Sequence, residues 1–285
     1  MTDLPEVKSR AALLELLRRR GLRSHRDRGQ NFLVEGTAVA RILEAAELQP
    51  DSTVLEIGPG LGALTLALAS AARTVVAVEI DSGLVAALRD EILPATQGVE
   101  LHHADFLQWD IDARFPPGQP RCPVVANIPY KITSSILARL FERRDRFDRL
   151  LLMVQKEVAD RLSAAPAEDD YSSLSVFMAL SGAVRTVARI PSGSFLPRPD
   201  VDSVVLRIDL REQPLFADLP DADVMRTVRA CFAQRRKQLL GCLVNARLGE
   251  RSAVEAALTR AGIDPTRRGE TLTLDEFAEL TRRLR

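Results

Sequence analysis

The sequence predicts an α/β protein in which a Rossmann-like, mainly parallel sheet is followed by a small all-helical C-terminal domain. Short β-branched apolar runs alternate with Ala- and Leu-rich helical stretches between residues 53 and 154, which is typical of a parallel sheet covered by helices. A glycine-rich turn at 58–62 directly follows the first apolar run, and beyond residue 220 only helical periodicity remains. We therefore expect an N-terminal helix and basic arm (1–28), a Rossmann-like domain (29–212) and a helical domain (213–285).

The elements follow from hydrophobic periodicity. Helices are predicted at 11–20 and 37–48, before the sheet begins. Strands are predicted at 53–57, 74–80, 99–104, 123–126 and 150–154, with helices at 61–72, 82–92 and 133–141. Residues 182–190 and 203–210 are expected to close the sheet as an antiparallel edge hairpin. After a proline-containing stretch at 213–220, we expect helices at 223–234, 237–248, 252–261 and 274–284.

The composition is that of a globular protein with no preference for one charge. The 285 residues carry a formal net charge of +0, so attraction to nucleic acid must come from local patches. No apolar stretch is long enough to span a membrane, and the N-terminus lacks the layout of a signal peptide. The 3 cysteines are scattered without a Cys-x-x-Cys pair, which indicates a reducing cytoplasm and no structural metal site. We expect a cytoplasmic protein that binds neither metal nor membrane.

The glycine turn indicates a nucleotide-containing cofactor. Gly58 and Gly60 stand where a strand meets a helix, and glycine permits a tight turn and close backbone approach to a ligand. The next predicted strand ends near Glu79, whose carboxylate is suited to accept hydrogen bonds from both hydroxyls of a ribose. The pattern Gly58-x-Gly60-x-x-Ala63 also satisfies the dinucleotide fingerprint, so the turn alone does not separate NAD from S-adenosylmethionine.

Two further strand-end acids favour S-adenosylmethionine. Glu56 precedes the first glycine by two positions, where it can meet the positively charged amino-acid end of the cofactor. Asp105 ends the third predicted strand and is suited to the adenine amino group, and Phe106 can pack on the adenine ring. The alternative is that Glu56 and Asp105 only cap helices or turns.

The tetrapeptide Asn127-Ile128-Pro129-Tyr130 follows another apolar strand, so it belongs at the same edge of the sheet. The carboxamide oxygen of Asn127 and a backbone carbonyl held by Pro129 can each accept an N–H of an exocyclic amine. Tyr130 offers a face on which a base can stack. This chemistry fits methyl transfer to a nucleobase nitrogen by positioning and electrostatics, on an unpaired or flipped nucleotide. A plain strand-to-helix turn is the structural alternative.

These motifs resemble the ribosomal RNA adenine N6,N6-dimethyltransferase family over nearly the whole chain. Residues 29–33 (Gly-Gln-Asn-Phe-Leu) resemble its N-terminal cofactor motif, which implies that Asn31 and Leu33 line the cofactor pocket together with Asn127. Residues 194–203 resemble a second motif, in which Phe195 would stack on the target base. Residues 232–237 and 262–265 resemble the small-subunit branch of the family. The fold implied is a Rossmann-like S-adenosylmethionine methyltransferase sheet with a helical C-terminal domain.

The resemblance implies dimethylation of two adjacent adenosines near the 3′ end of 16S ribosomal RNA, in a late 30S particle during small-subunit biogenesis. We expect the protein to act as a monomer. Three positions depart from the family pattern: Asp27-Arg28 replaces a basic-aromatic pair, Asp200 replaces a lysine and Gly241 replaces an asparagine. These departures concern RNA contacts and leave the cofactor motifs intact.

Two basic clusters are candidates for RNA phosphate contacts. The first spans residues 18–28 and includes Arg26 and Arg28. The second lies on the predicted C-terminal helices and includes Arg229, Arg235, Arg236 and Lys237. A solvated charged face is the alternative for both clusters.

Three other functions remain open from the sequence. A 23S ribosomal RNA adenine-N6 methyltransferase would share the first motifs but usually has a different C-terminal part. A non-catalytic RNA-binding assembly factor on the same fold would not need the motifs at Glu79 and 127–130. A nicotinamide dehydrogenase would need a proton donor near the cleft, which the sequence does not offer.

Overall fold

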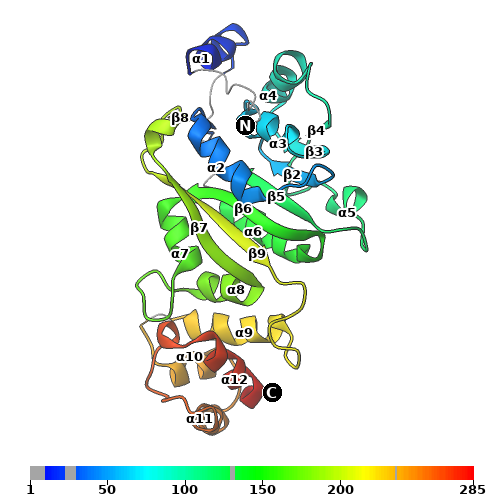
Figure 1. The fold of residues 1–285 in the computed structure, drawn as a ribbon. Coiled ribbons are helices and arrows are strands. Elements are labelled where there is room, and N and C mark those ends of the chain that lie inside the picture. Colours follow the sequence, from blue (N-terminus) through cyan, green and yellow to red (C-terminus); the bar gives the residue numbers. More distant parts are fainter. Residues whose placement is uncertain (1–9, 23–29, 129–131, 235) are drawn as a thin grey trace. The chain divides into compact units, whose positions relative to one another are not determined.

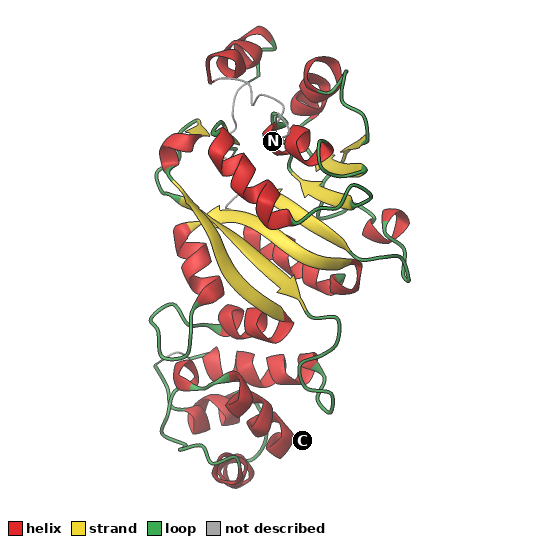
Figure 2. Ribbon diagram, viewed as in Figure 1, coloured by secondary structure: helices red, strands yellow, loops and turns green. Residues whose placement is uncertain are grey.

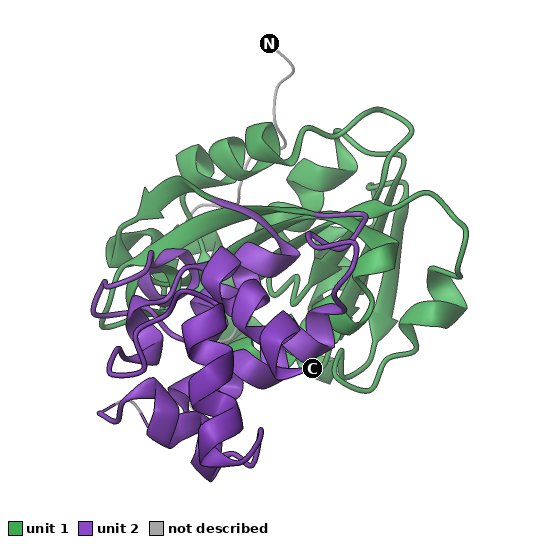
Figure 3. Cartoon of the chain, turned by 90° about the horizontal axis from the view of Figure 1, so that it is seen from below, with its two compact units in different colours: residues 1–159, 185–210 green, residues 160–184, 211–285 purple. Residues whose placement is uncertain are grey.

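The computed structural model describes residues 10–22, 30–128, 132–234 and 236–285. Its contacts divide the chain into two units (Figure 3). Unit 1 comprises Met1–Ala159 and Arg185–Leu210, and unit 2 comprises Asp160–Val184 and Arg211–Arg285. The division after Leu210 lies close to the boundary expected at residue 212, but residues 160–184, which were expected in the Rossmann-like domain, belong with the C-terminal helices. Tyr171, Val176 and Leu180 pack into the apolar core of unit 2, which explains this assignment.

The main sheet is built largely of parallel strands (Figures 1 and 2). Its order among the described residues is β4-β3-β2-β5-β6-β9-β7. The strands are β2 (Thr53–Ile57), β3 (Thr74–Glu79), β4 (Val99–His103), β5 (Cys122–Asn127), β6 (Phe147–Gln155), β7 (Gly182–Ile190) and β9 (Ser203–Leu210). The first five run parallel, and β9 pairs antiparallel with β6. The strand order reverses between β2 and β5, so their carboxyl ends form the crevice where open α/β sheets bind ligands.

Both faces of this sheet are buried. Helices α2 (Gly36–Ala46) and α3 (Ala63–Ala69) share one apolar cluster with Val54, Val75 and Val125 of the strands. The neighbouring residues Leu55 and Val76 point to the other face and are equally buried. Helix α4 (Ser82–Ala87) packs against β3 and β4. The strands therefore need near-continuous apolar runs, which is the pattern the sequence shows.

Helix α1 (Arg10–Arg19) packs against the segment that directly follows α4. Its leucines, Leu13, Leu16 and Leu17, join a cluster with Leu88 and Ile92 of the π-helix η2 (Leu88–Ile92). The remaining short elements of unit 1 are α5 (Ile111–Arg114), α6 (Thr133–Glu142) and the 3-10 turn η4 (Arg144–Arg146).

A second, two-stranded sheet in unit 1 was not foreseen from the sequence. Strand β1 (Phe32–Leu33) pairs antiparallel with β8 (Phe195–Leu196), directly after the 3-10 turn η5 (Ser192–Ser194). We call β1 and β8 together the ribbon. Its two strands are far apart in the sequence and too short to leave a periodic pattern.

Unit 2 is helical around one apolar core. Its helices include α8 (Ser173–Ser181), α9 (Asp221–Phe232), α10 (Leu239–Asn245), α11 (Arg251–Arg260), the 3-10 turn η6 (Gly269–Thr271) and α12 (Leu274–Leu284), while α7 (Lys156–Ser163) crosses from unit 1. The four C-terminal helices expected from periodicity are confirmed, although α10 is shorter than the predicted 237–248. Thr273 and Glu276 form a reciprocal capping box at the start of α12. None of the described helices has the length and apolarity to cross a membrane.

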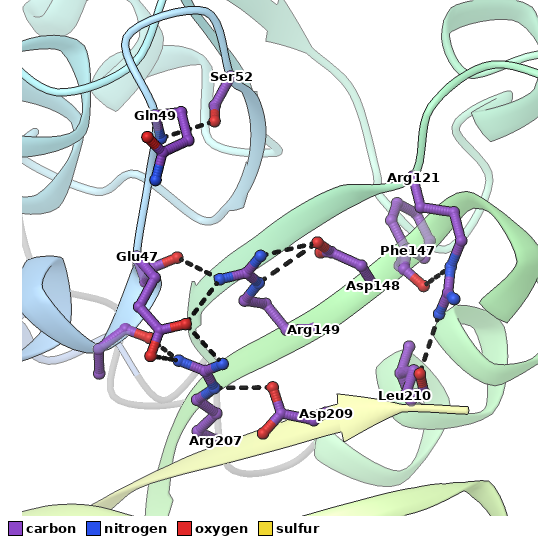
Figure 4. A network of polar contacts seen from close by, with 12 residues as sticks. Glu47, Gln49, Ser52, Arg121, Phe147, Asp148, Arg149, Arg207, Asp209 and Leu210 are labelled. Atoms are coloured by element: carbon purple, nitrogen blue, oxygen red, sulfur yellow. Dashed lines mark hydrogen bonds and ion pairs between the residues drawn. The ribbon is translucent and has the colours of Figure 1, made fainter. Parts of the chain in front are cut away.

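Two strand arginines fasten the C-terminal end of α2 to the sheet (Figure 4). Arg207 is buried and donates to the carbonyl of Ala45 at 2.8 Å and to Glu47 at 2.9 Å. Arg149 donates to the carbonyl of Ala46 at 3.1 Å and to Glu47 at 3.2 Å. The positive charges complement the carbonyl end of the helix dipole. The same arginines, Arg207 first, hold the pKa of Glu47 below its ordinary value.

We expect Glu47→Gln to lower the free energy of unfolding by about 1–2 kcal/mol at pH 7, because buried Arg207 loses a charged partner. The loss is smaller than for a fully buried pair since the Glu47 side chain is 53% exposed. A lowered carboxylate pKa stabilises the fold above the ordinary value of 4.5 and this contribution is lost as the pH falls. Urea unfolding at pH 7 and below pH 4.5 measures both effects. The control is Glu44→Gln on the exposed face of α2, which should change little; a pH-independent difference would contradict the explanation.

Candidate active site

A cavity of about 410 Å³ lies at the carboxyl edge of the sheet in unit 1. It is lined by the ends of β2, β3, β4 and β5 together with residues 30–33 and part of α6. This lining brings together the following sequence-predicted cofactor residues: Asn31, Leu33, Glu56, Gly58, Gly60, Glu79, Asp105, Phe106 and Asn127. Four separate strand ends thus meet at one pocket, as the parallel topology requires.

The turn after β2 depends on glycine. Gly58, Gly60 and Gly62 have φ values of +70°, +59° and +77°, a region that side chains with a Cβ rarely adopt. A Cβ on Gly60 would also lie 3.1 Å from the ring of Phe32, and one on Gly62 would lie 2.9 Å from Ile92. The glycines therefore allow the backbone of the turn to lie against Phe32 of the ribbon and to line the pocket.

Glu79 is held rigidly at the end of β3. One carboxylate oxygen accepts the backbone N–H of Gly60 at 3.1 Å, and the other accepts that of Asp81 at 2.9 Å. Each carboxylate oxygen can accept a second hydrogen bond, so the group can still receive two ligand hydroxyls. Burial nevertheless raises the pKa of Glu79, and the two backbone N–H groups oppose this only in part.

Glu56 is almost fully buried beside Glu79. Its Oε2 atom has no hydrogen-bond partner among the described residues. Burial first, and then the charge of Glu79, raise the pKa of Glu56 to about 8, while the nearby Thr65 hydroxyl offsets part of the effect. Among the residues that the structure describes, the lining contains no lysine, arginine or histidine. A cationic ligand would supply the positive charge that is absent around these two carboxylates among the described lining residues.

The contacts of Asp105 are compatible with both functions considered from the sequence, capping a turn and binding a ligand. Its Oδ1 accepts the backbone N–H of Leu107 at 2.9 Å and its Oδ2 accepts from Gln108 at 3.2 Å, so the residue does cap a turn. It also lines the pocket, beside the buried ring of Phe106. The turn fixes the carboxylate and leaves lone pairs for a ligand amine.

Asn127 ends β5 directly across from the glycine turn. Its Nδ2 donates to the backbone carbonyl of Asn31 at 2.9 Å. No hydrogen bond reaches its Oδ1 from any residue that the structure describes. The following Ile128 is buried and its N–H bonds to Met153, which anchors the start of the tetrapeptide to β6. Pro129 and Tyr130 lie outside the described residues.

The structure places Phe195 in the apolar core, an environment that does not favour the expected stacking function. Its side chain is 0% exposed and packs with Leu33, Ile190 and Val205 in the core under α2. In this structure the enclosed ring offers no open face to an incoming base. An apolar aromatic in a functional-looking motif gives the same sequence signal whether it binds a ligand or fills a core.

Several lining residues were not predicted from the sequence, and two of them have exposed apolar side chains. Ile80 and Ile132 line the cavity, although their side chains are 53% and 37% exposed. Large apolar side chains exposed beside a pocket commonly contact a flat apolar ligand surface. The available signal was position, since Ile80 directly follows Glu79 and Ile132 follows the tetrapeptide.

The basic clusters differ in how many of their charges are paired. Arg18, Arg19 and Arg20 of the first cluster are paired with acidic residues of unit 1. Arg26 and Arg28 lie outside the described residues, as does Arg235 of the second cluster. In contrast, Arg229, Arg236 and Lys237 are exposed in unit 2, and the described part of the chain holds no ion pair or side-chain hydrogen bond to them.

The family described as ribosomal RNA adenine dimethylase matches residues 21–285. The chain belongs to this family. Two relatives are each named ribosomal RNA small subunit methyltransferase A. The chain is 46% identical over 279 residues to the one from Moorella thermoacetica, covering 95% of this chain and 96% of the relative. It is 44% identical over 268 residues to the one from Geobacter metallireducens, covering 93% and 97%.

Solved structures related to this family member share its fold. The 23S rRNA methyltransferase ErmE is 34% identical, with a TM-score of 0.69 over 89% of this chain and 99% of that structure. A dimethyladenosine transferase from Plasmodium falciparum is 26% identical, with a TM-score of 0.74 over 87% and 95%. The α/β fold class and the methyltransferase class expected from the sequence are confirmed, and the nicotinamide dehydrogenase interpretation is set aside.

The raised pKa of Glu56 predicts how the stability of this dimethylase-family protein depends on pH when no ligand is bound. A folded-state pKa of about 8, above the ordinary 4.5, means that the fold keeps a proton that the unfolded chain releases. The contribution of Glu56 to stability is therefore fully present below pH 4.5 and is lost as the pH rises through about 8. We expect Glu56→Gln to be more stable than the parent by about 3–5 kcal/mol at pH 8.5, and nearly equal to it near pH 4.5.

Denaturant unfolding across this pH range provides the measurement. Glu79 titrates in both proteins and is coupled to Glu56, so the difference between them reports the ionisation of Glu56 together with its effect on Glu79. Parallel stability curves for the parent and Glu56→Gln would show that Glu56 is ionised in the pocket.

Proposed function

We propose that this protein transfers methyl groups from S-adenosylmethionine to the N6 amines of two adjacent adenosines near the 3′ end of 16S ribosomal RNA, within the 30S particle. The main support is the convergence of Glu56, Glu79 and Asn127 on one pocket at the switch point of the sheet. The first two are acids suited to a cationic nucleoside, and the third is an amide suited to an amine.

The pocket chemistry fits this cofactor better than a dinucleotide. S-adenosylmethionine carries an ammonium and a sulfonium, which would neutralise the buried, unpartnered Glu56. Glu79 would hold the ribose hydroxyls and Asp105 the adenine amine, with Phe106 beside the ring. A pyrophosphate would instead add negative charge to a lining whose described residues contain no cation. When bound, the cofactor supplies an electrophilic methyl group.

Asn127 would prepare the target nitrogen. Its Oδ1 accepts one N–H of the exocyclic amine, and a backbone carbonyl next to Pro129 is proposed to accept the other. These two contacts favour a pyramidal nitrogen whose lone pair is available for bond formation. No covalent nucleophile is needed, so the contribution of the protein is positioning and electrostatic stabilisation. We propose Tyr130 as the stacking face for the base, because the Phe195 ring is enclosed in the core.

The decisive experiment incubates the protein with radiolabelled S-adenosylmethionine and, in parallel reactions, with 30S particles that lack adenine dimethylation or with protein-free 23S RNA. Nuclease digestion and mass spectrometry then locate the label. N6,N6-dimethyladenosine at two adjacent positions near the 3′ end of 16S RNA is the expected result. Label only on protein-free 23S RNA would favour the 23S alternative. Binding to 30S without label, despite normal cofactor binding, would favour a non-catalytic assembly factor.

Asn127→Ala should slow methyl transfer by at least about a hundredfold, as expected when a preorganised polar group no longer meets the reacting atom. Cofactor affinity should fall by no more than about threefold, because the acids that hold the cofactor remain. Single-turnover rates at saturating cofactor and calorimetric titration separate the two effects. The control is Asn245→Ala in unit 2. Equal loss of rate and affinity would make Asn127 chiefly a cofactor residue.

Neutralising the exposed cations of unit 2 should weaken binding to 30S particles. In Arg229→Gln/Arg236→Gln/Lys237→Gln, the slope of log affinity against log salt should shrink by about 0.7–0.9 for each phosphate that is no longer neutralised. Cofactor affinity and thermal stability should stay unchanged, since these side chains are exposed. Arg283→Gln is the matched control because Arg283 is already paired with Glu279. An unchanged salt slope would identify the cluster as a solvated face.

A further inference from the structure

The orientation of the Asn127 carboxamide is set by a backbone carbonyl. A carboxamide can be turned either way, so its oxygen and nitrogen can exchange places. Nδ2 of Asn127 lies 2.9 Å from the carbonyl oxygen of Asn31, which can only accept a hydrogen bond. The N–H end of the amide must therefore face Asn31. Oδ1, the atom needed as acceptor for the target amine, is left free.

The Asn31 carbonyl is itself held by the ribbon. Phe32 pairs with Leu196 and Leu33 pairs with Phe195. The N–H of Val34 extends the pairing by donating to the carbonyl of Ser194 at 2.9 Å. The buried ring of Phe195 anchors β8 in the core beneath. Asn31 directly precedes this paired strand, so the position of its carbonyl is restricted by the ribbon.

A side-chain contact closes the end of the ribbon. The hydroxyl of Ser194, which is 7% exposed, donates to the carboxylate of Glu35. Glu35 occupies the N-cap position of α2, where an acid would ordinarily accept an N–H of its own helix. Here it makes no such cap bond. The carboxylate therefore joins the end of η5, directly before β8, to the start of α2 and does not serve as a helix cap.

The segment after β8 is fastened to the main sheet. Asp202 accepts the backbone N–H of Ser192 at 2.8 Å through its side chain. Its backbone carbonyl accepts the N–H of Lys156 at 3.1 Å, next to the pairing of Gln155 with Ser203. The ribbon is therefore fixed relative to β6 and β9, and through Asn31 it is fixed relative to the carboxyl end of β5.

We propose that the Glu35–Ser194 contact is a positioning pair for methyl transfer: it holds the ribbon so that the Asn31 carbonyl turns Oδ1 of Asn127 toward the target amine. The proposal rests on the function proposed above. It gives residues 194–203 a function in the reaction that does not require Phe195 to stack on a base. Disturbing the pair should loosen the acceptor geometry while the acids around the cofactor stay in place.

The test compares Ser194→Ala, which removes the donor, with Ser194→Thr, which keeps a hydroxyl. On 30S particles that the parent protein demonstrably methylates, we expect Ser194→Ala to slow single-turnover methyl transfer about fivefold to tenfold. Its affinity for S-adenosylmethionine should stay within about twofold. The emission of Trp109, the only tryptophan in the sequence, offers a probe of cofactor binding because its ring lies 6.4 Å from that of Phe106. Ser194→Thr should restore most of the rate.

Two further comparisons separate positioning from general loss of stability. Ser70→Ala also deletes one hydroxyl hydrogen bond in unit 1, to Ala67 at the end of α3, and should leave the rate unchanged. In an Asn127→Ala background, Ser194→Ala should cause no additional slowing, because the residue through which it acts is gone. Glu35→Ala should behave like Ser194→Ala, and Glu35→Gln, which keeps an acceptor, should be close to the parent.

The outcomes are distinct. Equal slowing by Ser194→Ala in the parent and Asn127→Ala backgrounds, or a parallel loss of cofactor affinity, would overturn the proposal. Full activity of a folded Ser194→Ala, with folding checked by thermal melting, would also overturn it. Because the parent protein is assayed on the same particles, these results leave the proposed function standing, whereas an inactive parent would refute that function itself.

Discussion

The burial of Glu56 and Glu79 at one edge of the sheet is the constraint on which the rest of unit 1 depends. Two neighbouring carboxylates removed from water oppose each other's ionisation, and burial raises the pKa of both. Backbone N–H groups of the glycine turn and of Asp81 compensate Glu79, but Oε2 of Glu56 has no partner among the described residues. The fold thus carries an unfavourable local arrangement that a cationic ligand would relieve.

The opposite edge of the same sheet shows the reverse situation. There Arg149 and Arg207 are satisfied by Glu47, by flanking acids and by the last carbonyls of α2. Secure attachment of α2 at its C-terminal end lets its N-terminal end carry the ribbon and Asn31. The stabilising contacts at one edge therefore compensate for the unfavourable proximity of two carboxylates at the other. Proteins commonly tolerate such locally unfavourable groups where function requires them.

The sequence predicted what short-range patterns determine. Strand ends, the glycine turn and the acids after each strand follow from periodicity and from the geometry of parallel sheets, so the residues around Glu56, Glu79 and Asn127 could be placed together in advance. The ribbon could not, because β1 and β8 are two residues each and pair across most of the domain. The burial of Phe195 could not be foreseen for the same reason, since its environment is created by distant segments.

Charge separation within a neutral chain explains how one protein can suit both a cation and a polyanion. The formal net charge is +0, yet acids line the pocket of unit 1 while exposed arginines and a lysine in unit 2 lack acidic partners among the described residues. A neutral molecule exerts little long-range attraction, so RNA would be held only by contacts within about 8–10 Å at physiological salt. Under the proposed function, selection of the adenosines then depends on the shape of the particle around them, and the pocket needs only to recognise an exposed amine.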